Sequence, residues 1–309
     1  MRKRIYKENV PQHVFFRGKD GGIIFYCMQD CIYYITLYSC LSERHGIVTN
    51  AFSLMPNHAH KQQQAGNRQD FTAFNSEFSA KYTRGYNKQH RRNGELFDNP
   101  FGSYPKSTGK LIRSNLSYIC NNGAVGKLSK GVIDYRWNMM AYYHNRSPFS
   151  DGIKRDRISK RFRCKVKMVD YLRKTGTPLD YSIQVMLYDG LGKAEKSQLT
   201  DYILAKYNPV DYRMIELSFG SFEKALAGME ANTGSEHDIQ EDWEDYSVFK
   251  KLGLESMKKG IDLQTINFEM MNSRELFELR LFLKKKIAAS EKQLDKFLHM
   301  NVAHNPPDL

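Results

Sequence analysis

Hydrophobic and polar positions in the first half of the chain follow two periods, one typical of strands and one typical of helices. Strands are predicted over 12–17, 47–54, 58–64 and 101–105, where apolar and β-branched residues alternate or lie between turn residues. Helices are predicted over 28–44 and 68–89. One face of the first helix carries Cys31, Ile35, Tyr38, Leu41 and Ser42, and one face of the second carries Phe71, Phe74, Phe78 and Tyr82.

These elements predict a small α+β domain, because an antiparallel sheet with helices on one or both faces buries the apolar side of each element. A third helix follows over 108–121, with Gly123 as its C-terminal cap. Its apolar stripe comprises Ile112, Leu116 and Ile119, and a polar row comprises Lys110, Ser114, Tyr118 and Asn122. Residues four apart lie one above the other on a helix, so Tyr118 and Asn122 can face the same point.

The character of the chain changes after about residue 148. The segment 154–167 is dense in Lys and Arg and contains a single acid, Asp156, so it is either a solvated face or a site of phosphate contact. The rest is predicted to be mostly helical, as a helical bundle or, on a weaker signal, a helix-turn-helix. Helices are expected over 194–207, 211–219 and 221–231, followed by an exposed acidic connection at 236–245.

The last predicted element is one long helix that starts at Asn272, with Glu275 in a loose capping box. Its apolar positions are Leu276, Leu279, Leu283, Ile287 and Leu294. The expected organisation is a first domain at 1–148, a basic linker at 149–170, a helical accessory region at 171–300 and a disordered tail at 301–309.

The composition of the chain indicates what kind of partner it binds. The 309 residues carry a formal charge of +13, with a pI near 9.3, which favours a polyanion. No apolar run is long enough to span a membrane, and the N-terminus lacks the apolar core of a signal peptide, so we expect a cytoplasmic, nucleoid-associated protein. The five cysteines show no CxxC pair and are predicted to be reduced and mostly packed.

The most informative segment is Met55-Pro56-Asn57-His58-Ala59-His60. Alternate residues of a strand point to the same face, so His58 and His60 would stand side by side. Neutral imidazole is the commonest protein metal ligand, and two on one strand face form half of a divalent-metal site. The spacing alone is weak, because most His-x-His pairs are ordinary surface or half-buried histidines.

The whole phrase from Leu54 to His60 resembles the His-hydrophobic-His (HUH) element of single-tyrosine transposases, most closely the REP-associated tyrosine transposases. Residues 13–18 and 24–26 resemble that family's opening strand and the turn into its first helix. Residues 118–122 match its nucleophile helix, and 134–137 resemble its closing segment. The resemblance covers roughly residues 5–145. It implies a ferredoxin-like core with the histidine pair on the central sheet.

The resemblance also implies a mechanism. The phenolate of Tyr118 attacks a phosphodiester of single-stranded DNA, stays bound to the 5′ phosphate and releases a 3′ hydroxyl, and a second attack reverses the step at a new junction. His58 and His60 would bind Mg²⁺ or Mn²⁺, with the Asn122 oxygen as third ligand. Among the 19 tyrosines, Tyr82 and Tyr86 are the rival nucleophiles.

Two departures from the family pattern stand out. Lys61-Gln62-Gln63-Gln64 replaces apolar strand residues, which predicts either a poorly buried strand or a wet site faced by Gln62 and Gln64. Asn122-Gly123 replaces the family's Asn-Pro. Proline would fix the direction in which the chain leaves the helix, whereas glycine permits that direction at a greater entropic cost. Both departures fit a divergent active enzyme or a decaying copy.

Two basic stretches are the predicted DNA contacts. The first, with Tyr82 and Tyr86 interleaved for base stacking, fits either single-strand binding or an exposed helix end. The predicted contacts are Lys81, Arg84, Lys88, Arg91, Arg92, Arg155, Arg157, Lys160, Arg161 and Arg163. The expected partner is single-stranded DNA with hairpins or inverted repeats, bound by a homodimer. The alternatives are a DNA-hairpin-binding protein that does not cleave, an HUH replication initiator or relaxase, and a metal-free RNA-binding module.

Overall fold

The computed structural model describes residues 6–154, 158–231 and 245–300, and its first part is α+β as predicted. The elements in order are β1 (Gln12–Arg17), α1 (Met28–Arg44), β2 (Val48–Met55), β3 (His58–Gln64), α2 (Arg68–Gln89) and β4 (Gly102–Pro105). Within the described residues the strands form one antiparallel sheet in the order β2-β3-β1-β4. The predicted bounds of these elements are confirmed to within about a residue.

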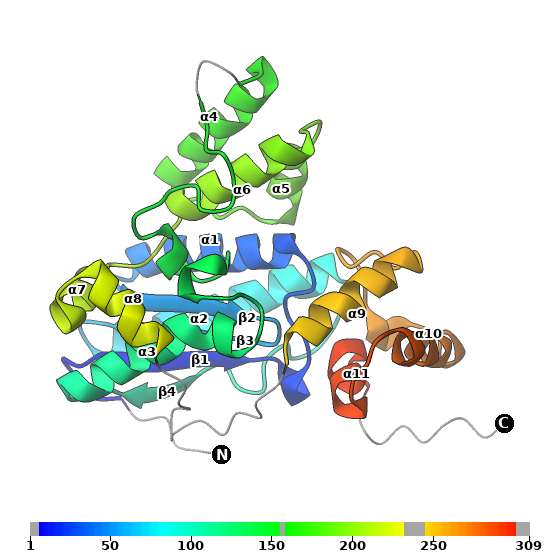
Figure 1. The fold of residues 1–309 in the computed structure, drawn as a ribbon, viewed down its shortest axis with the longest axis horizontal. Helices are drawn as coiled ribbons and strands as arrows, with labels where there is room; N and C mark the ends of the chain where they lie inside the picture. Colours follow the sequence, from blue (N-terminus) through cyan, green and yellow to red (C-terminus); the bar gives the residue numbers. More distant parts are fainter. Residues whose placement is uncertain (1–5, 155–157, 232–244, 301–309) are drawn as a thin grey trace.

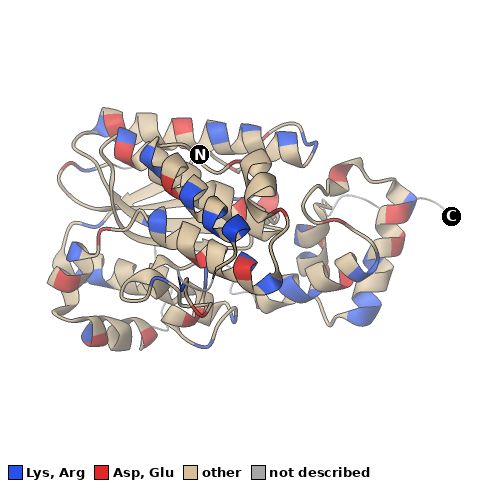
Figure 2. Cartoon of the chain, turned by 90° about the horizontal axis from the view of Figure 1, so that it is seen from above, with Lys and Arg blue, Asp and Glu red and all other residues tan. Residues whose placement is uncertain are grey.

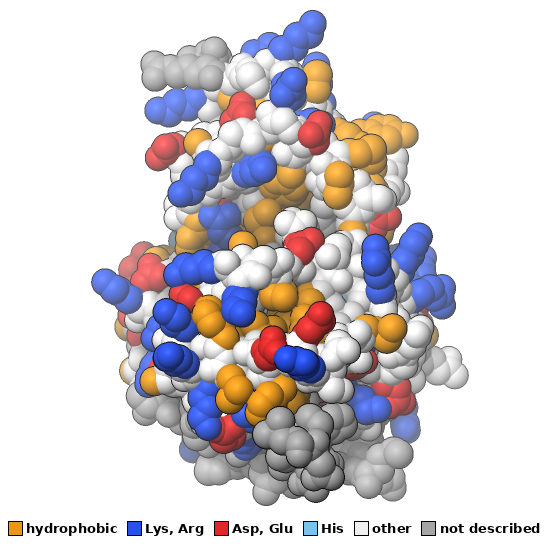
Figure 3. Space-filling model, turned by 90° about the vertical axis from the view of Figure 1, so that its right-hand side faces the viewer, with side chains coloured by type: hydrophobic (Ala, Val, Ile, Leu, Met, Phe, Trp, Pro, Cys, Tyr) orange, Lys and Arg blue, Asp and Glu red, His pale blue; other side chains and the backbone are white. Residues whose placement is uncertain are grey.

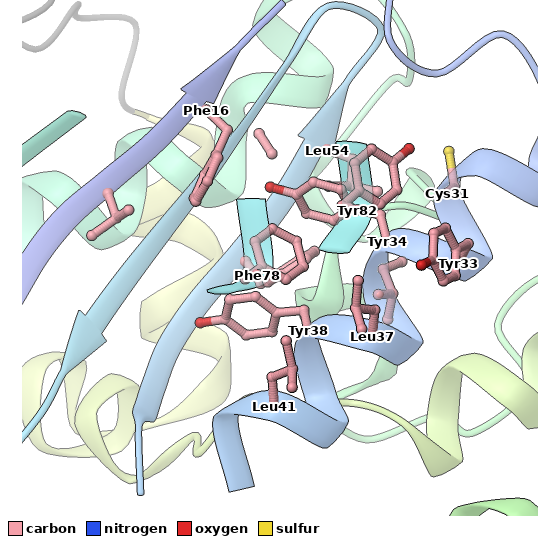
Figure 4. Packing of buried hydrophobic residues seen from close by; sticks show 14 of the residues in the cluster. Phe16, Cys31, Tyr33, Tyr34, Leu37, Tyr38, Leu41, Leu54, Phe78 and Tyr82 are labelled. Carbon is pink, nitrogen blue, oxygen red and sulfur yellow. The ribbon is translucent and has the colours of Figure 1, made fainter. Parts of the chain in front are cut away.

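Helices cover both faces of this sheet (Figure 1). Helices α1 and α2 pack on one face, and α3 (Gly109–Val125) packs on the other against β2 and β3. The face under α1 and α2 is filled by aromatic rings, several of which are drawn in Figure 4. Most of the pairs among Phe16, Tyr34, Tyr38, Phe78 and Tyr82 meet edge to face, the geometry that aromatic quadrupoles favour.

Lys61 lies inside this aromatic core with no exposed surface. Its Nζ donates a hydrogen bond to the Tyr34 hydroxyl at 2.6 Å and lies 3.8 Å from the centroid of the Phe16 ring. Further rings surround it at 4.7–5.8 Å, those of Tyr34, Phe78, Tyr38 and Phe52. Burial lowers the pKa of this ammonium well below its usual range, and the ring faces offset part of that penalty.

The polar end of β3 is therefore not poorly buried, and that prediction is wrong. Lys61, Gln62 and Gln63 are all fully buried. Gln63 faces α1 and α2, where its amide donates to the Tyr38 hydroxyl at 2.8 Å and accepts from Asn75 at 3.1 Å. Gln62 faces α3 instead of a wet site. Because Lys61, Gln62 and Gln63 all have protein hydrogen-bond partners, this end of the strand can be buried without apolar side chains.

Helix α3 runs past Gly123, so the predicted cap at that position is also wrong. The helix ends at Val125 with Gly126 as C-cap. A Cβ on Gly123 would lie 2.7 Å from the Tyr135 ring, so the glycine serves close packing and not helix termination.

The second half of the chain is mostly helical as predicted, but it wraps around the first half in three groups (Figure 1). The first group packs on α1 and comprises α4 (Lys160–Lys174), α5 (Tyr181–Tyr188) and α6 (Lys193–Lys206). The second packs on α3 and comprises α7 (Arg213–Phe219) and α8 (Phe222–Glu230). The third comprises α9 (Ser247–Lys258), α10 (Ser273–Lys286) and α11 (Glu291–Leu298).

These groups change two expected boundaries. Part of the predicted linker forms α4, which crosses the expected division at residue 170. The predicted last helix is two helices: Asn272 does cap α10, but Ile287 is extended and Ser290 starts α11 with its own capping box to Gln293. The acidic connection lies mostly, and the predicted tail entirely, outside the described residues.

A buried carboxylate joins the helical groups to the core. Asp30 at the start of α1 accepts hydrogen bonds from the backbone amides of Tyr26 and Cys27 and from the Tyr181 hydroxyl of α5. The same side chain meets His90 Nε2 at 2.9 Å, while His90 Nδ1 faces the Ile266 carbonyl. Asp30 thus joins α1, α5 and the end of α2, and His90 extends the connection to the C-terminal region.

Among the described helices none combines the length and hydrophobicity needed to cross a bilayer. Figure 3 shows the side of the molecule formed largely by the C-terminal helices, where hydrophobic side chains lie at the surface among charged ones. In the C-terminal region, Leu254, Met257, Met270 and Leu281 are exposed.

Replacing Lys61 with Met should change how stability depends on pH. The folded pKa of Lys61 is lowered, whereas the unfolded value is about 10.4. Between the two values only the unfolded chain binds the proton, so the stability of the wild type relative to Lys61→Met should rise with pH by about 1.4 kcal/mol per unit within that interval.

Urea denaturation of both proteins at pH 7.0 and 9.5 measures the difference. Lys110→Met is the matched control, because it makes the same substitution at an exposed position of α3. An identical difference between wild type and Lys61→Met at both pH values would contradict the expected titration.

Candidate active site

The α3 face of the sheet gathers three histidines. Side chains at His58, His60 and Gln62 of β3 point to this face, and the antiparallel register with β1 pairs His13 with Gln62 and Phe15 with His60. His13 and His60 therefore lie diagonally across the strand pair. Their ring nitrogens, His13 Nε2 and His60 Nδ1, are 2.9 Å apart, a direct hydrogen bond.

Tyr118 reaches the same cluster from α3. Its hydroxyl lies 3.5 Å from His60 Nε2, and the two ring centroids are 5.2 Å apart. The helix is held in register by Gln62, whose amide donates to Asn115 Oδ1 at 2.9 Å and whose oxygen accepts from Asn50 at 3.1 Å. Because Gln62 is two residues from His60, this bond sets how far along the strand Tyr118 sits.

The His58 ring has a defined tautomer. Asn57 donates from its Nδ2 to the Gly21 carbonyl at 3.0 Å, so its Oδ1 must accept the 2.7 Å hydrogen bond from His58 Nδ1. In the neutral ring the lone pair that can bind a metal is therefore on Nε2. An oriented imidazole of this kind is typical of metal sites, where the second ring nitrogen is held by a neighbour.

Asn122 lies on α3 four residues after Tyr118 and is buried. Its Nδ2 has no hydrogen-bond partner within the described residues, which is an unusual state for a buried amide. Nor do the described residues contain a group of three or more His, Cys, Asp or Glu side chains arranged to hold a metal ion. An ion on His58 and His60 would therefore need an oxygen from outside that set, and the Asn122 amide fits this chemistry.

The two rival tyrosines lie away from the histidine cluster. Tyr82 and Tyr86 lie on the other side of the sheet and are buried in the α1–α2 core. Burial raises the pKa of both phenols well above the usual value, which further weakens them as nucleophiles. The prediction that they interleave with surface cations for base stacking is also wrong, because neither ring reaches solvent.

The predicted DNA-contacting cations do not converge on the histidine cluster. Lys81, Arg84 and Lys88 lie on α2 and Lys160, Arg161 and Arg163 on α4, both on the α1 side of the sheet (Figures 1 and 2). Arg92 is largely buried in an ion pair with Glu269 at 2.7 Å, which makes it a structural residue. Arg91 has a positive φ of 50° just past α2. Arg155 and Arg157 lie outside the described residues.

Two residues of the cluster, His13 and Tyr246, were not predicted as site residues. His13 was recognised only as part of a strand, and the only available signal was its place on a strand that resembles the family's first. Tyr246 comes from the C-terminal region, and its ring centroid lies 5.6 Å from that of His58. No signal in the sequence links it to the histidines, because the contact depends on tertiary packing.

The surrounding residues shield the histidine cluster from solvent. His60 is 1% exposed and Tyr118 is 4% exposed. Helices α7 and α8 pack over α3 on one side. Tyr246 covers the cluster near His58, and its backbone amide donates a hydrogen bond to the Gly126 carbonyl at 3.1 Å. Access of a nucleic acid to the Tyr118 hydroxyl therefore requires movement of a covering element.

Comparison with known proteins gives little further identification. No protein-family model and no curated protein matches the chain. Among solved structures, the chain is similar to a REP-associated tyrosine transposase bound to a REP hairpin, with 15% identity over 45% of this chain and 81% of that chain. The TM-score of 0.38 marks a partial structural likeness, so function has to be argued from the residues of this chain.

The packing of α3 against Tyr135 predicts a position-specific cost of adding one methyl group. Gly123→Ala should destabilise the fold by about 1–3 kcal/mol, because the new Cβ would overlap the Tyr135 ring. Gly109→Ala on the same helix meets nothing within 4 Å and should be neutral or slightly stabilising. Thermal and urea unfolding followed by circular dichroism measure both, and equal effects at the two positions would refute the packing argument.

Proposed function

We propose that the chain is a transposase-like single-stranded DNA endonuclease and strand transferase with Tyr118 as its nucleophile. The observation that carries this proposal is the 3.5 Å approach of the Tyr118 hydroxyl to His60, on the sheet face that also carries His58. The strand order β2-β3-β1-β4, with helices after β1 and β3, supports a ferredoxin-like core for the same domain.

The proposed step exchanges one phosphoester for another. The Tyr118 oxygen attacks the phosphorus of a DNA phosphodiester, a tyrosyl–phosphate bond forms, and the bond to the 3′ oxygen breaks. The phenolic proton is balanced by the proton that the released 3′ hydroxyl gains. Attack by a different DNA 3′ hydroxyl on the tyrosyl phosphate then restores the phenol and joins the new strands, so no water or external energy source is consumed.

His58, His60 and Asn122 would hold the divalent cation, Mg²⁺ or Mn²⁺. When bound, such a cation polarises the scissile phosphate and offsets the charge that develops on it. His60 can serve only if the Tyr118 hydroxyl leaves its Nε2, since His60 Nδ1 already meets His13. In this arrangement His13 orients the His60 ring and Asn57 orients the His58 ring.

The proposed partner is single-stranded DNA, in hairpins or inverted repeats, which suits the formal charge of +13. A homodimer would supply two tyrosines for the paired cleavages that moving a DNA segment requires. The burial of the cluster favours a second candidate function, a protein that binds DNA hairpins without cutting them. In that case Tyr118 would be a core residue and not a nucleophile.

A covalent-adduct assay tests the nucleophile. Labelled single-stranded hairpins from the sequences flanking the gene, incubated with protein and Mn²⁺, should give a denaturant-resistant protein–DNA band. Tyr118→Phe and His60→Ala should each reduce that band by at least about 100-fold. Tyr86→Phe is the matched control and should keep it. Hairpin binding without any band in the wild type would establish the binding-only function, and a band that persists in Tyr118→Phe would reject this tyrosine.

A separate measurement tests the third ligand. Asn122→Ala should weaken Mn²⁺ binding by at least about tenfold, whereas Asn122→Asp should keep it because a carboxylate offers the same oxygen. Titration of protein against the electron paramagnetic resonance signal of free Mn²⁺ reports binding without DNA. Equal Mn²⁺ affinity in the wild type and Asn122→Ala would exclude Asn122 as a ligand.

A further inference from the structure

A basic groove lies on the outer side of α1 and α2, away from the sheet. Its volume is about 880 Å³. Helices α1 and α2 form two of its walls, and the end of α4 with the turn that follows forms the third. The lining residues that matter here are Tyr33, Leu41, Arg84, Lys88 and Lys174.

Three cations of this groove have no charge partner among the residues that the structure describes. The only acid in its lining, Glu43, is bound in a two-pronged ion pair by Arg173. By contrast, the exposed Arg84, Lys88 and Lys174 form no hydrogen bond or ion pair within the described chain. They come from two segments that are about 90 residues apart, and only the tertiary fold brings them to one groove.

The floor between these cations is apolar. Tyr33, Leu37, Cys40 and Leu41 of α1 line it, so charged rim and apolar base occur together. Gly85 of α2 lets the Tyr33 ring pack directly on that helix, because a Cβ there would lie 2.5 Å from the ring.

The groove and Tyr118 lie on opposite sides of the sheet. Tyr118 approaches from α3, whereas α1 and α2 separate the groove from the other sheet face (Figure 1). Figure 2 shows Lys and Arg spread along the helices on this side. A strand whose phosphate lies at Tyr118 therefore cannot use the groove with the same few nucleotides.

We propose that this groove binds single-stranded nucleic acid, with its phosphates on Arg84, Lys88 and Lys174 and its bases or sugars against the apolar floor. A cationic rim over an apolar floor suits unpaired nucleotides, because a duplex hides its bases and presents only phosphates. The bound segment is separate from the one that Tyr118 attacks. The inference rests on the proposed function only in taking this nucleic acid to be DNA.

Charge reversal tests the groove directly. Binding of fluorescent 30-nucleotide oligo(dT) by the full chain is followed by anisotropy over a range of KCl concentrations. Arg84→Glu combined with Lys88→Glu should raise Kd at least tenfold and should reduce the slope of log K against log salt by about 1.4, the loss of two single-strand phosphate contacts.

The matched control combines Lys250→Glu with Lys251→Glu on α9, which changes the net charge equally at two exposed positions outside the groove. This variant should change Kd less than threefold and leave the salt slope unchanged. Equal losses in both double variants would reduce the effect to net charge and overturn the proposal, as would no loss in the groove variant. Circular dichroism confirms that both variants are folded.

Competition and adduct assays separate this inference from the proposed function. Blunt duplex DNA that competes as well as single strands would overturn the assigned occupant. Groove-dependent binding without a Tyr118 adduct would reject the nuclease and keep the groove. An adduct that forms normally in the wild type, together with unchanged oligo(dT) binding by the groove variant, would reject the groove and keep the nuclease.

Discussion

The burial of β3 on both faces is the constraint on which the rest of this structure depends. A strand with a period of two sends His58, His60 and Gln62 to α3 and sends Lys61 and Gln63 to α1 and α2. Each of these polar side chains would be costly in an apolar interior without a partner. Hydrogen bonds to residues of the covering helices supply these partners on both faces of the strand. The same bonds fix the positions of those helices.

On the α3 side, this requirement also builds the candidate site. Gln62 must be satisfied, and the bonds that satisfy it, to Asn115 and Asn50, hold α3 at one position along the strand. The bond between Gln62 and Asn115 thereby brings Tyr118 close to His60, although neither of these two residues takes part in it. The same packing leaves the cluster closed, so a function at Tyr118 depends on the mobility of the elements that cover it.

On the opposite side, the requirement produces an aromatic core around the amino group of Lys61. Lys61 contacts ring faces and the Tyr34 hydroxyl, and this arrangement needs large aromatic residues from both α1 and α2. Buried Tyr82 belongs to this core, which is why its neighbouring cations face outwards without an aromatic surface of their own. The basic groove instead takes its apolar floor from α1 and one of its cations, Lys174, from α4.

The sequence by itself determined the elements of the first half, because the periods of two and 3.6 are local properties that depend on which side chains must be buried. It also placed His58 beside His60 and Tyr118 beside Asn122, since each pair lies within one element. In the second half it located α6, α7, α8 and the start of α10, but it missed α4, α5 and α9. It also missed the break near Ile287, where Ser290 offers a competing start.

Only the tertiary structure decided which of these elements meet. Strand register brought His13 to His60, and long-range packing brought Tyr246 to His58. Tyr118 and the basic residues of α2 and α4 ended up on opposite faces of the sheet. Register, face and long-range packing depend on the satisfaction of all buried polar groups at once, which no local pattern records.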